Sequence, residues 1–170
     1  MLSQRSSEFL EAFKSNVRPC TDERAYGRDP GNPYHDLLWF ATKVLEPKLT
    51  VELGACTGGS TSYLAAASTG QVISIDIENR AETHQRLSVF DSIKLIHGDT
   101  RDPALAQQIS KHGQIDLLFI DTDHTTEQVK AEMGGSNHLT MAEAVRHYTT
   151  QSCLFPGRRF ERIVPRRTLL

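Results

Sequence analysis

Short apolar runs and segments with helical spacing alternate along the chain from residue 49 onward. Four runs are almost continuously apolar, and each is followed by a segment whose apolar positions lie three or four residues apart. Near-continuous apolar strands that alternate with helices are typical of a parallel sheet covered on both faces. We therefore predict a Rossmann-like, three-layer αβα sandwich around a parallel sheet. The expected strands are residues 49–53, 71–76, 93–98 and 115–121, and the expected helices are residues 59–68, 80–90, 103–113 and 125–133.

The N-terminal part of the chain is expected to contain two further helices. Helical spacing of apolar residues predicts an amphipathic helix at residues 3–16 and a second helix at residues 34–45. The segment between them is rich in Pro, Gly and Asp, which indicates a loop. We therefore divide off residues 1–33 as an N-terminal helix and loop, followed by a Rossmann-like domain at residues 34–133.

The last part of the chain, residues 134–170, differs from the domain before it. Helical spacing predicts one more helix at residues 139–148, and the Arg-rich end is expected to be poorly ordered. Because no apolar run occurs here, we expect the C-terminal strands of the sheet to be missing, which leaves the strand at residues 115–121 at an exposed edge. Such an edge favours a homodimer or aggregation. Truncation or a shifted reading frame near Gly134 would explain the change, and a divergent lid is the alternative.

Composition and charge narrow the class of protein. A chain of 170 residues, 38% of them hydrophobic, can bury one core, and its net charge of -2 offers no electrostatic surface for nucleic acid or an anionic membrane. No apolar run approaches the length needed to span a bilayer, and the N-terminus lacks the features of a signal peptide. Three widely spaced cysteines suggest neither a disulfide framework nor a zinc site. We therefore expect a cytoplasmic protein that binds neither nucleic acid nor a membrane.

The turn after the first expected strand is rich in glycine. It reads E-L-G-A-C-T-G-G-S-T, from Glu52 to Thr61. Glycine lets the backbone turn sharply and lets a ligand approach closely, and the first amides of the next helix offer hydrogen-bond donors. The turn lacks the G-x-G-x-x-G of a pyrophosphate-binding site, and the preceding acid suits a cationic amino-acid ligand better. The alternative is a tight turn that closes a strand–helix unit without any ligand.

Acidic residues stand at the ends of all four expected strands. Because parallel strands end at the same edge, these side chains are expected to converge on one crevice. They are Glu52, Asp76, Asp99 and Asp121. A carboxylate at Asp76 can accept both hydroxyls of a ribose, and an N-cap is the alternative. An Asx turn is the alternative for Asp99, and a helix N-terminus is the alternative for the segment from Asp121 to His124.

The glycine-rich turn resembles motif I of the class I S-adenosylmethionine (SAM)-dependent methyltransferases, E/D-x-G-x-x-x-G. The sequence of the turn is similar to that of the small-molecule O-methyltransferases, including the group related to cephalosporin hydroxylase and the macrolide-sugar methyltransferases. The resemblance implies that Asp76 binds the ribose of SAM and that Asp99, with Thr100, meets the adenine ring. The residues implied to line the methionine part of SAM are Gly54, Ala55, Gly58 and Ser60, with Glu52 near the ammonium group.

The fourth expected strand, which reads D-L-L-F-I-D-T-D-H, resembles that of the metal-dependent O-methyltransferases. The resemblance implies that Asp121 ligates a divalent cation, usually Mg²⁺, with Asp123 beside it. Such an ion lowers the pKa of an acceptor hydroxyl and orients it. His124 lies where a catalytic base or an acceptor-side group stands. In the family a fifth strand supplies the remaining metal ligands, and no apolar strand with such a pair follows here, so the metal site is incomplete on the sequence.

The resemblance covers residues 34–133 and implies transfer of a methyl group from SAM to an oxygen of a small-molecule acceptor. The first alternative is a truncated module that binds SAM, or binds nothing, and catalyses no transfer. The second alternative is an NAD(P)-binding oxidoreductase. The absence of G-x-G-x-x-G and of a Tyr-x-x-x-Lys pair disfavours this second alternative.

Overall fold

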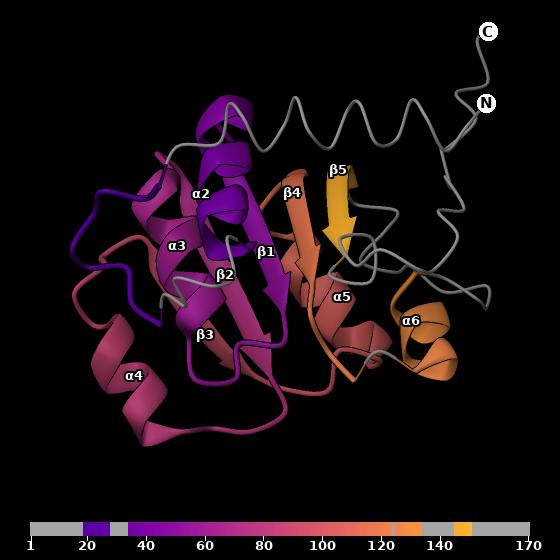
Figure 1. The fold of residues 1–170 in the computed structure, drawn as a ribbon. Helices are drawn as coiled ribbons and strands as arrows, with labels where there is room; N and C mark the ends of the chain where they lie inside the picture. Colours follow the sequence, from indigo (N-terminus) through magenta and orange to yellow (C-terminus); the bar gives the residue numbers. More distant parts are fainter. Residues whose placement is uncertain (1–18, 28–33, 124, 134–144, 151–170) are drawn as a thin grey trace, which may run out of the picture.

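Five parallel strands form the centre of the molecule. The computed structural model describes residues 19–27, 34–123, 125–133 and 145–150. The strand order is β3-β2-β1-β4-β5, and every neighbouring pair is parallel (Figure 1). The strands are β1 (Leu49–Leu53), β2 (Gln71–Asp76), β3 (Ile93–His97), β4 (Ile115–Ile120) and β5 (Val145–Thr150). The helices are α2 (Tyr34–Leu45), α3 (Gly59–Ala67), α4 (Ala81–Leu87), α5 (Pro103–Ser110) and α6 (Thr126–Met133).

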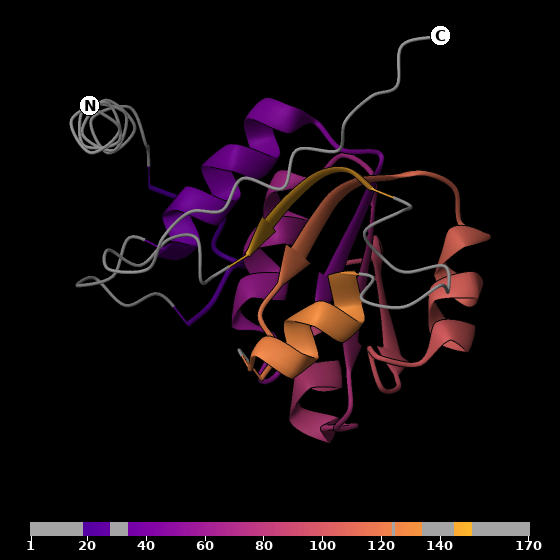
Figure 2. The same cartoon turned by 90° about the vertical axis from the view of Figure 1, so that its right-hand side faces the viewer.

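Helices cover both faces of the sheet, so the molecule has three layers (Figure 2). On the face of α2, α3 and α4, a buried cluster includes Leu64, Leu87 and Phe119. On the face of α5, a second buried cluster includes Ile109 and Leu118. The predicted Rossmann-like, three-layer αβα fold with a parallel sheet is therefore confirmed. None of the described helices has the length and apolar character that a membrane span requires.

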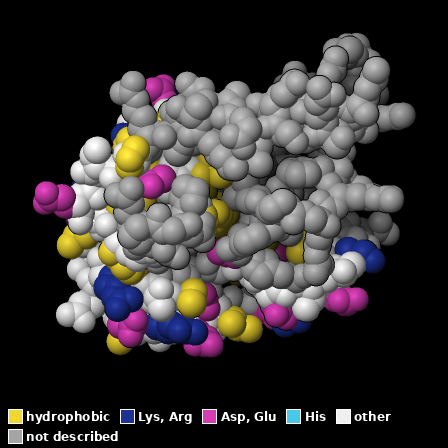
Figure 3. All heavy atoms as spheres, viewed as in Figure 1, with side chains coloured by type: hydrophobic (Ala, Val, Ile, Leu, Met, Phe, Trp, Pro, Cys, Tyr) yellow, Lys and Arg dark blue, Asp and Glu magenta, His cyan; other side chains and the backbone are white. Residues whose placement is uncertain are grey.

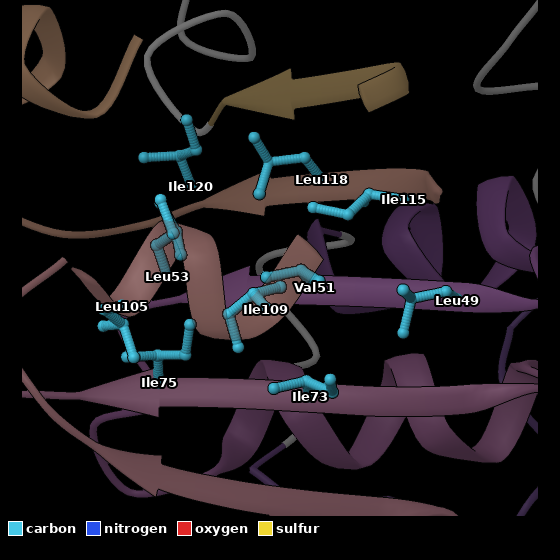
Figure 4. Close-up of a cluster of buried hydrophobic side chains, with 11 residues drawn as sticks. Leu49, Val51, Leu53, Ile73, Ile75, Leu105, Ile109, Ile115, Leu118 and Ile120 are labelled. Atoms are coloured by element: carbon cyan, nitrogen blue, oxygen red, sulfur yellow. The ribbon is translucent and has the colours of Figure 1, made fainter. Parts of the chain in front are cut away.

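Strand β1 runs through the centre of the sheet, and all five of its residues are buried. Side chains alternate between the two faces of a strand. Leu49, Val51 and Leu53 pack towards α5 with neighbours from β2 and β4 (Figure 4). Burial of each such aliphatic side chain stabilises the fold by about 1.5–3 kcal/mol. Thr50 and Glu52 therefore occupy the face of β1 that α3 covers, and this places a carboxylate inside the protein.

Strand β5 corrects the prediction of missing C-terminal strands for one of them, the fifth strand of the sheet. It pairs in parallel with β4, from Ile115 beside Val145 to Ile120 beside Thr150. The sequence V-R-H-Y-T-T is polar, but its β-branched and aromatic residues favour an extended backbone, and β4 offers unpaired backbone groups at its edge. The predicted helix at residues 139–148 is therefore wrong for the part that lies in β5.

The covering of β4 also removes the reason for expecting a homodimer. That expectation rested on an exposed β4 edge, and β5 now pairs along it. Residues 145–150 of the expected tail form β5, the rest of residues 134–170 lies outside the described residues, and the poor order expected of the tail stays a prediction. The helix expected at residues 3–16 also lies outside them.

Candidate functional site

A cleft of about 190 Å³ lies where β1, β2 and β3 end, beside the start of α4. In open α/β sheets, ligands bind at this carboxyl edge of the strands. The polar residues of its walls include Asp76, Asn79, Arg80, His84 and His97, and the apolar ones include Ala55, Leu95 and Ile96. Two residues predicted to bind the cofactor, Ala55 and Asp76, therefore line the same cleft.

Charges of both signs lie together at this edge. Figure 3 shows basic and acidic side chains interspersed along the lower rim of the molecule, which is the carboxyl edge in the view of Figure 1. Close ion pairs join Arg80 to Glu78 at 2.6 Å, Arg86 to Glu82 at 3.0 Å and Arg101 to Asp99 at 2.6 Å. Because these charges are paired, the rim is polar, but its electrostatic potential is neither strongly positive nor strongly negative.

Gly54 is required by the close approach of the β4 end. Its backbone has φ of +96°, and a Cβ atom at this position would collide with the backbone carbonyl of Asp121. The amide of Asp121 donates a hydrogen bond to the carbonyl of Leu53 at 2.8 Å, which holds the two strand ends together. Glycine here is explained by packing of the turn itself, which was the alternative to a ligand. Contact of Gly54 with SAM stays a prediction.

Gly58 lies under a segment from the N-terminal part of the chain. It precedes α3 with φ of +83°, and a Cβ atom there would lie 2.5 Å from the hydroxyl oxygen of Tyr26. That hydroxyl donates to the carbonyl of Thr57, and the amide of Tyr26 donates to Oγ of Ser62 at 3.1 Å. The predicted SAM contact of Gly58 stays a prediction, and the space beside it is filled by Tyr26.

Glu52 lies in a buried cage of three hydroxyl groups. The residue is fully buried, and its carboxylate accepts hydrogen bonds of 2.5 Å from Oγ of Ser60, Oγ1 of Thr61 and Oγ of Ser74. Burial raises the pKa of this carboxyl to about 7, although the three hydrogen bonds act in the opposite direction. The cage joins β1, β2 and the first turn of α3.

This position changes the roles expected of Glu52 and Ser60. Glu52 is fully buried in this cage, so its side chain has a role inside the protein, and its contact with the ammonium group of a ligand stays a prediction. Ser60 is 8% exposed and directs its hydroxyl to Glu52, away from the cleft. We therefore assign both side chains to the positioning of the α3 start, whose backbone amides stay at the carboxyl edge.

Asp76 stands at the end of β2 with its carboxylate at the cleft. Its Oδ2 accepts from the amide of Cys56 at 2.6 Å, and its Oδ1 accepts from the amide of Glu78 at 2.8 Å. The N-cap residue of α4 is Arg80, so the alternative reading of Asp76 as the cap of that helix is wrong. The two amides fix the carboxylate, and each oxygen keeps a free lone pair for a further donor.

Asp99 and Thr100 are not among the residues that line the cleft. The carboxylate of Asp99 accepts from the amide of Arg101 at 2.9 Å, which is the Asx turn weighed as its alternative. The guanidinium of Arg101 also binds it, which lowers the pKa of Asp99. Thr100 is buried and donates to Oε1 of Glu132 at 2.6 Å. The adenine contact of both residues stays a prediction.

Asp121 and Asp123 follow β4, and His124 lies outside the described residues. Asp121 is half-buried, whereas Asp123 is exposed. Within the part of the chain that the structure describes, no group of three or more His, Cys, Asp or Glu side chains could hold a metal ion. Two carboxylates give Mg²⁺ too few protein ligands. The described residues therefore do not fit a metal centre, and no chemical step is derived from one.

Several cleft residues were missed by the sequence analysis. Nε2 of His84 lies 2.7 Å from Oδ1 of Asn79, and Nε2 of His97 lies 2.8 Å from the carbonyl oxygen of Ile77. His97 ends β3, so its place at a strand end was a usable signal. His84 and Asn79 carry no such signal, because they reach the cleft only through the placement of α4 against the sheet.

A comparison with protein families and solved structures agrees with this fold. A putative caffeoyl-CoA O-methyltransferase from Staphylococcus aureus shares 18% identity, with a TM-score of 0.56 over 90% of this chain and 70% of that one. The Podospora anserina methyltransferase PaMTH1, bound to SAH, shares 19% identity, with a TM-score of 0.51 over 76% and 63%. TomG from Streptomyces achromogenes, an O-methyltransferase in complex with SAM, shares 17% identity, with a TM-score of 0.50 over 67% and 60%. No curated protein matches.

At sequence identities below 20%, the similarity to these solved structures shows the fold. The chain spans less than two thirds of the length of PaMTH1 and of TomG.

The family is shown by a match to a family model. The family model "Rhamnosyl O-methyltransferase/CmcI" matches residues 33–144, more than half of the 170 residues and beyond the expected limit at residue 133. The NAD(P)-binding alternative is therefore wrong. The chain belongs to the rhamnosyl O-methyltransferase/CmcI family.

Proposed function

We propose that this chain binds SAM in the cleft at the carboxyl edge and transfers the methyl group to a hydroxyl oxygen of a small molecule. The observation that carries the proposal is the carboxylate of Asp76, held at the cleft by two backbone amides. Family membership supplies the reaction class. The cleft lies at the carboxyl edge of β1, β2 and β3, and ligands of such sheets usually bind at this edge.

The walls of the cleft suit an adenosine group. Asp76 accepts the two ribose hydroxyls, because both of its oxygens are fixed and keep lone pairs. Leu95, Ile96 and Ala55 offer apolar contact to the flat ring. Gly54, at the start of the glycine-rich turn, lies against the end of β4, and we place the reacting groups there.

SAM supplies a methyl group on a positively charged sulfur, which becomes a neutral thioether when the methyl group leaves. The contribution of the chain is to hold the acceptor oxygen in line with the C–S bond, since orientation supplies much of the rate in such transfers. A C–O bond forms as the C–S bond breaks, and the hydroxyl proton passes to a base. We assign this role to Asp121, whose backbone lies against Gly54 at the end of β4.

A transfer assay tests this function. The chain is incubated with SAM and a panel of small hydroxyl compounds that includes rhamnose-bearing acceptors, and release of S-adenosylhomocysteine is measured. We expect release that depends on an acceptor, a raised KM for SAM in Asp76→Ala, and a lowered kcat in Asp121→Asn. Binding of SAM without release for any acceptor would favour the inactive SAM-binding module instead.

A further inference from the structure

A second buried carboxylate lies on α6, apart from the cage of Glu52. Glu132 is 1% exposed, and its carboxylate accepts hydrogen bonds from three side chains. The donors are Oγ1 of Thr100 at 2.6 Å, Nε2 of Gln128 at 2.7 Å and Oγ1 of Thr122 at 3.1 Å. Nε2 of Gln128 also lies 3.0 Å from Oγ1 of Thr100. One carboxylate therefore joins α6 to two loops that are distant in sequence.

The two loops are those that carry candidate site residues. Thr100 directly follows Asp99 in the loop after β3, and Thr122 directly follows Asp121 in the loop after β4. In the sheet, β2 and β1 lie between β3 and β4, so no strand pairing joins these two loops. The carboxylate of Glu132 spans this gap from the end of α6.

The three hydrogen bonds require a side chain with two acceptor oxygens at position 132. A buried carboxylate is costly unless it is hydrogen-bonded, and an apolar side chain would fill the same space with less desolvation. All three donors point to Glu132, and removing its oxygens would leave the buried hydroxyl of Thr100 and the part-buried hydroxyl of Thr122 without this acceptor. The arrangement therefore does more than fill volume, since it fixes the relative position of two loops.

We propose that Glu132 is a positioning residue of the methyl-transfer site, which holds the loop of Asp99 and the loop of Asp121 in register through Thr100 and Thr122. This inference rests on the proposed function, because it assumes that SAM and its acceptor meet these two loops. The hydrogen bonds of Glu132 to Thr100 and to Thr122, here called the Thr100 tie and the Thr122 tie, have separable effects. The Thr100 tie orders the side of the site next to β3, whereas the Thr122 tie orders the side next to β4, where transfer takes place.

The test uses variants of the full chain that keep side-chain volume. Glu132→Met removes both acceptor oxygens and keeps a side chain of similar length, so neither threonine hydroxyl finds an acceptor at this position. Thr122→Val removes only the tie to the loop after β4. Glu127→Gln alters an exposed residue on the same helix and is the matched control. Ile109→Val removes one methylene from the buried core and is the control for a general loss of stability.

The first readout is amide hydrogen exchange without ligand. We expect Glu132→Met to raise exchange about tenfold in the segments 99–102 and 121–123, while the turn of Asp76 stays unchanged. Thr122→Val should raise exchange only in the segment 121–123. Exchange that is unchanged in both loops, or raised equally across the molecule as in Ile109→Val, would overturn the proposal.

The second readout separates this inference from the proposed function. In Glu132→Met we expect SAM affinity or kcat to fall about tenfold, with wild-type values in Glu127→Gln and Ile109→Val. Thr122→Val should lower kcat and leave the dissociation constant of SAM within about twofold. Wild-type kinetics in Glu132→Met would overturn the positioning role. Failure of the wild-type chain to bind SAM would instead refute the proposed function, and the exchange result would still decide whether Glu132 ties the loops.

Discussion

The buried carboxylate of Glu52 predicts a pH dependence of stability that one substitution removes. Its pKa rises from 4.5 to about 7 in the folded protein, because the charged form is desolvated. One pKa unit corresponds to about 1.4 kcal/mol, so the shift amounts to about 3 kcal/mol. The folded state favours the protonated form. The contribution is therefore fully present below pH 4.5 and is lost as the pH rises through about 7.

Glu52→Gln replaces the titrating group by a neutral amide of the same shape. The hydroxyls of Ser60, Thr61 and Ser74 can both donate and accept, so the cage can re-form around the amide. We expect the free energy of unfolding of the wild type to fall by about 3 kcal/mol relative to that of Glu52→Gln between pH 4.5 and about 8.

Urea unfolding of both proteins at several pH values measures this difference directly. Other carboxyl groups titrate in the same range, but they cancel when the two curves are subtracted. Asp91→Asn, at an exposed turn, is the control and should run parallel to the wild type. If the curves of the wild type and Glu52→Gln are also parallel, Glu52 does not titrate inside the fold and the reasoning is refuted.

Two further predictions concern the turns at the carboxyl edge. Gly54→Ala should cost about 3 kcal/mol or more of unfolding free energy, because its Cβ atom would meet the backbone of Asp121. Gly113→Ala has a similarly positive φ but open space around it and should cost only about 1–2 kcal/mol, as thermal unfolding can show. Arg101→Ala should raise the pKa of Asp99 towards its ordinary value in an NMR titration, and an unchanged pKa would contradict the ion pair.

The fold was predictable because its signal is repetitive. Four apolar runs followed by helical segments specify a parallel sheet, and each of the four strands appears where it was expected. β5 was not predictable from apolarity, because V-R-H-Y-T-T joins the sheet through backbone pairing with β4. A strand at the edge of a sheet is stabilised by backbone hydrogen bonds to its neighbour, and these do not require an apolar sequence.

The site was predictable only in part, because the position of a residue in the sequence does not show how deeply its side chain is buried. Asp76 lies at the cleft as expected, whereas Glu52 is turned into the interior. The strand pattern held a clue, since β1 is covered on both faces and every side chain in it must be buried. The contacts of Glu132 depend on how α6 packs across two loops, and no local pattern in the sequence encodes that.

The central claim is that the cleft beside Asp76 binds SAM, and calorimetric titration tests it most directly. The measurement compares the wild type with Asp76→Ala and with the control Asp91→Ala, whose side chain is exposed at a turn after α4. The account predicts that SAM binds the wild type and the control alike. Asp76→Ala should bind about tenfold to a hundredfold more weakly, because two ribose hydroxyls lose their acceptor. Equal affinity of SAM for all three proteins would contradict the account and remove Asp76 from the binding site.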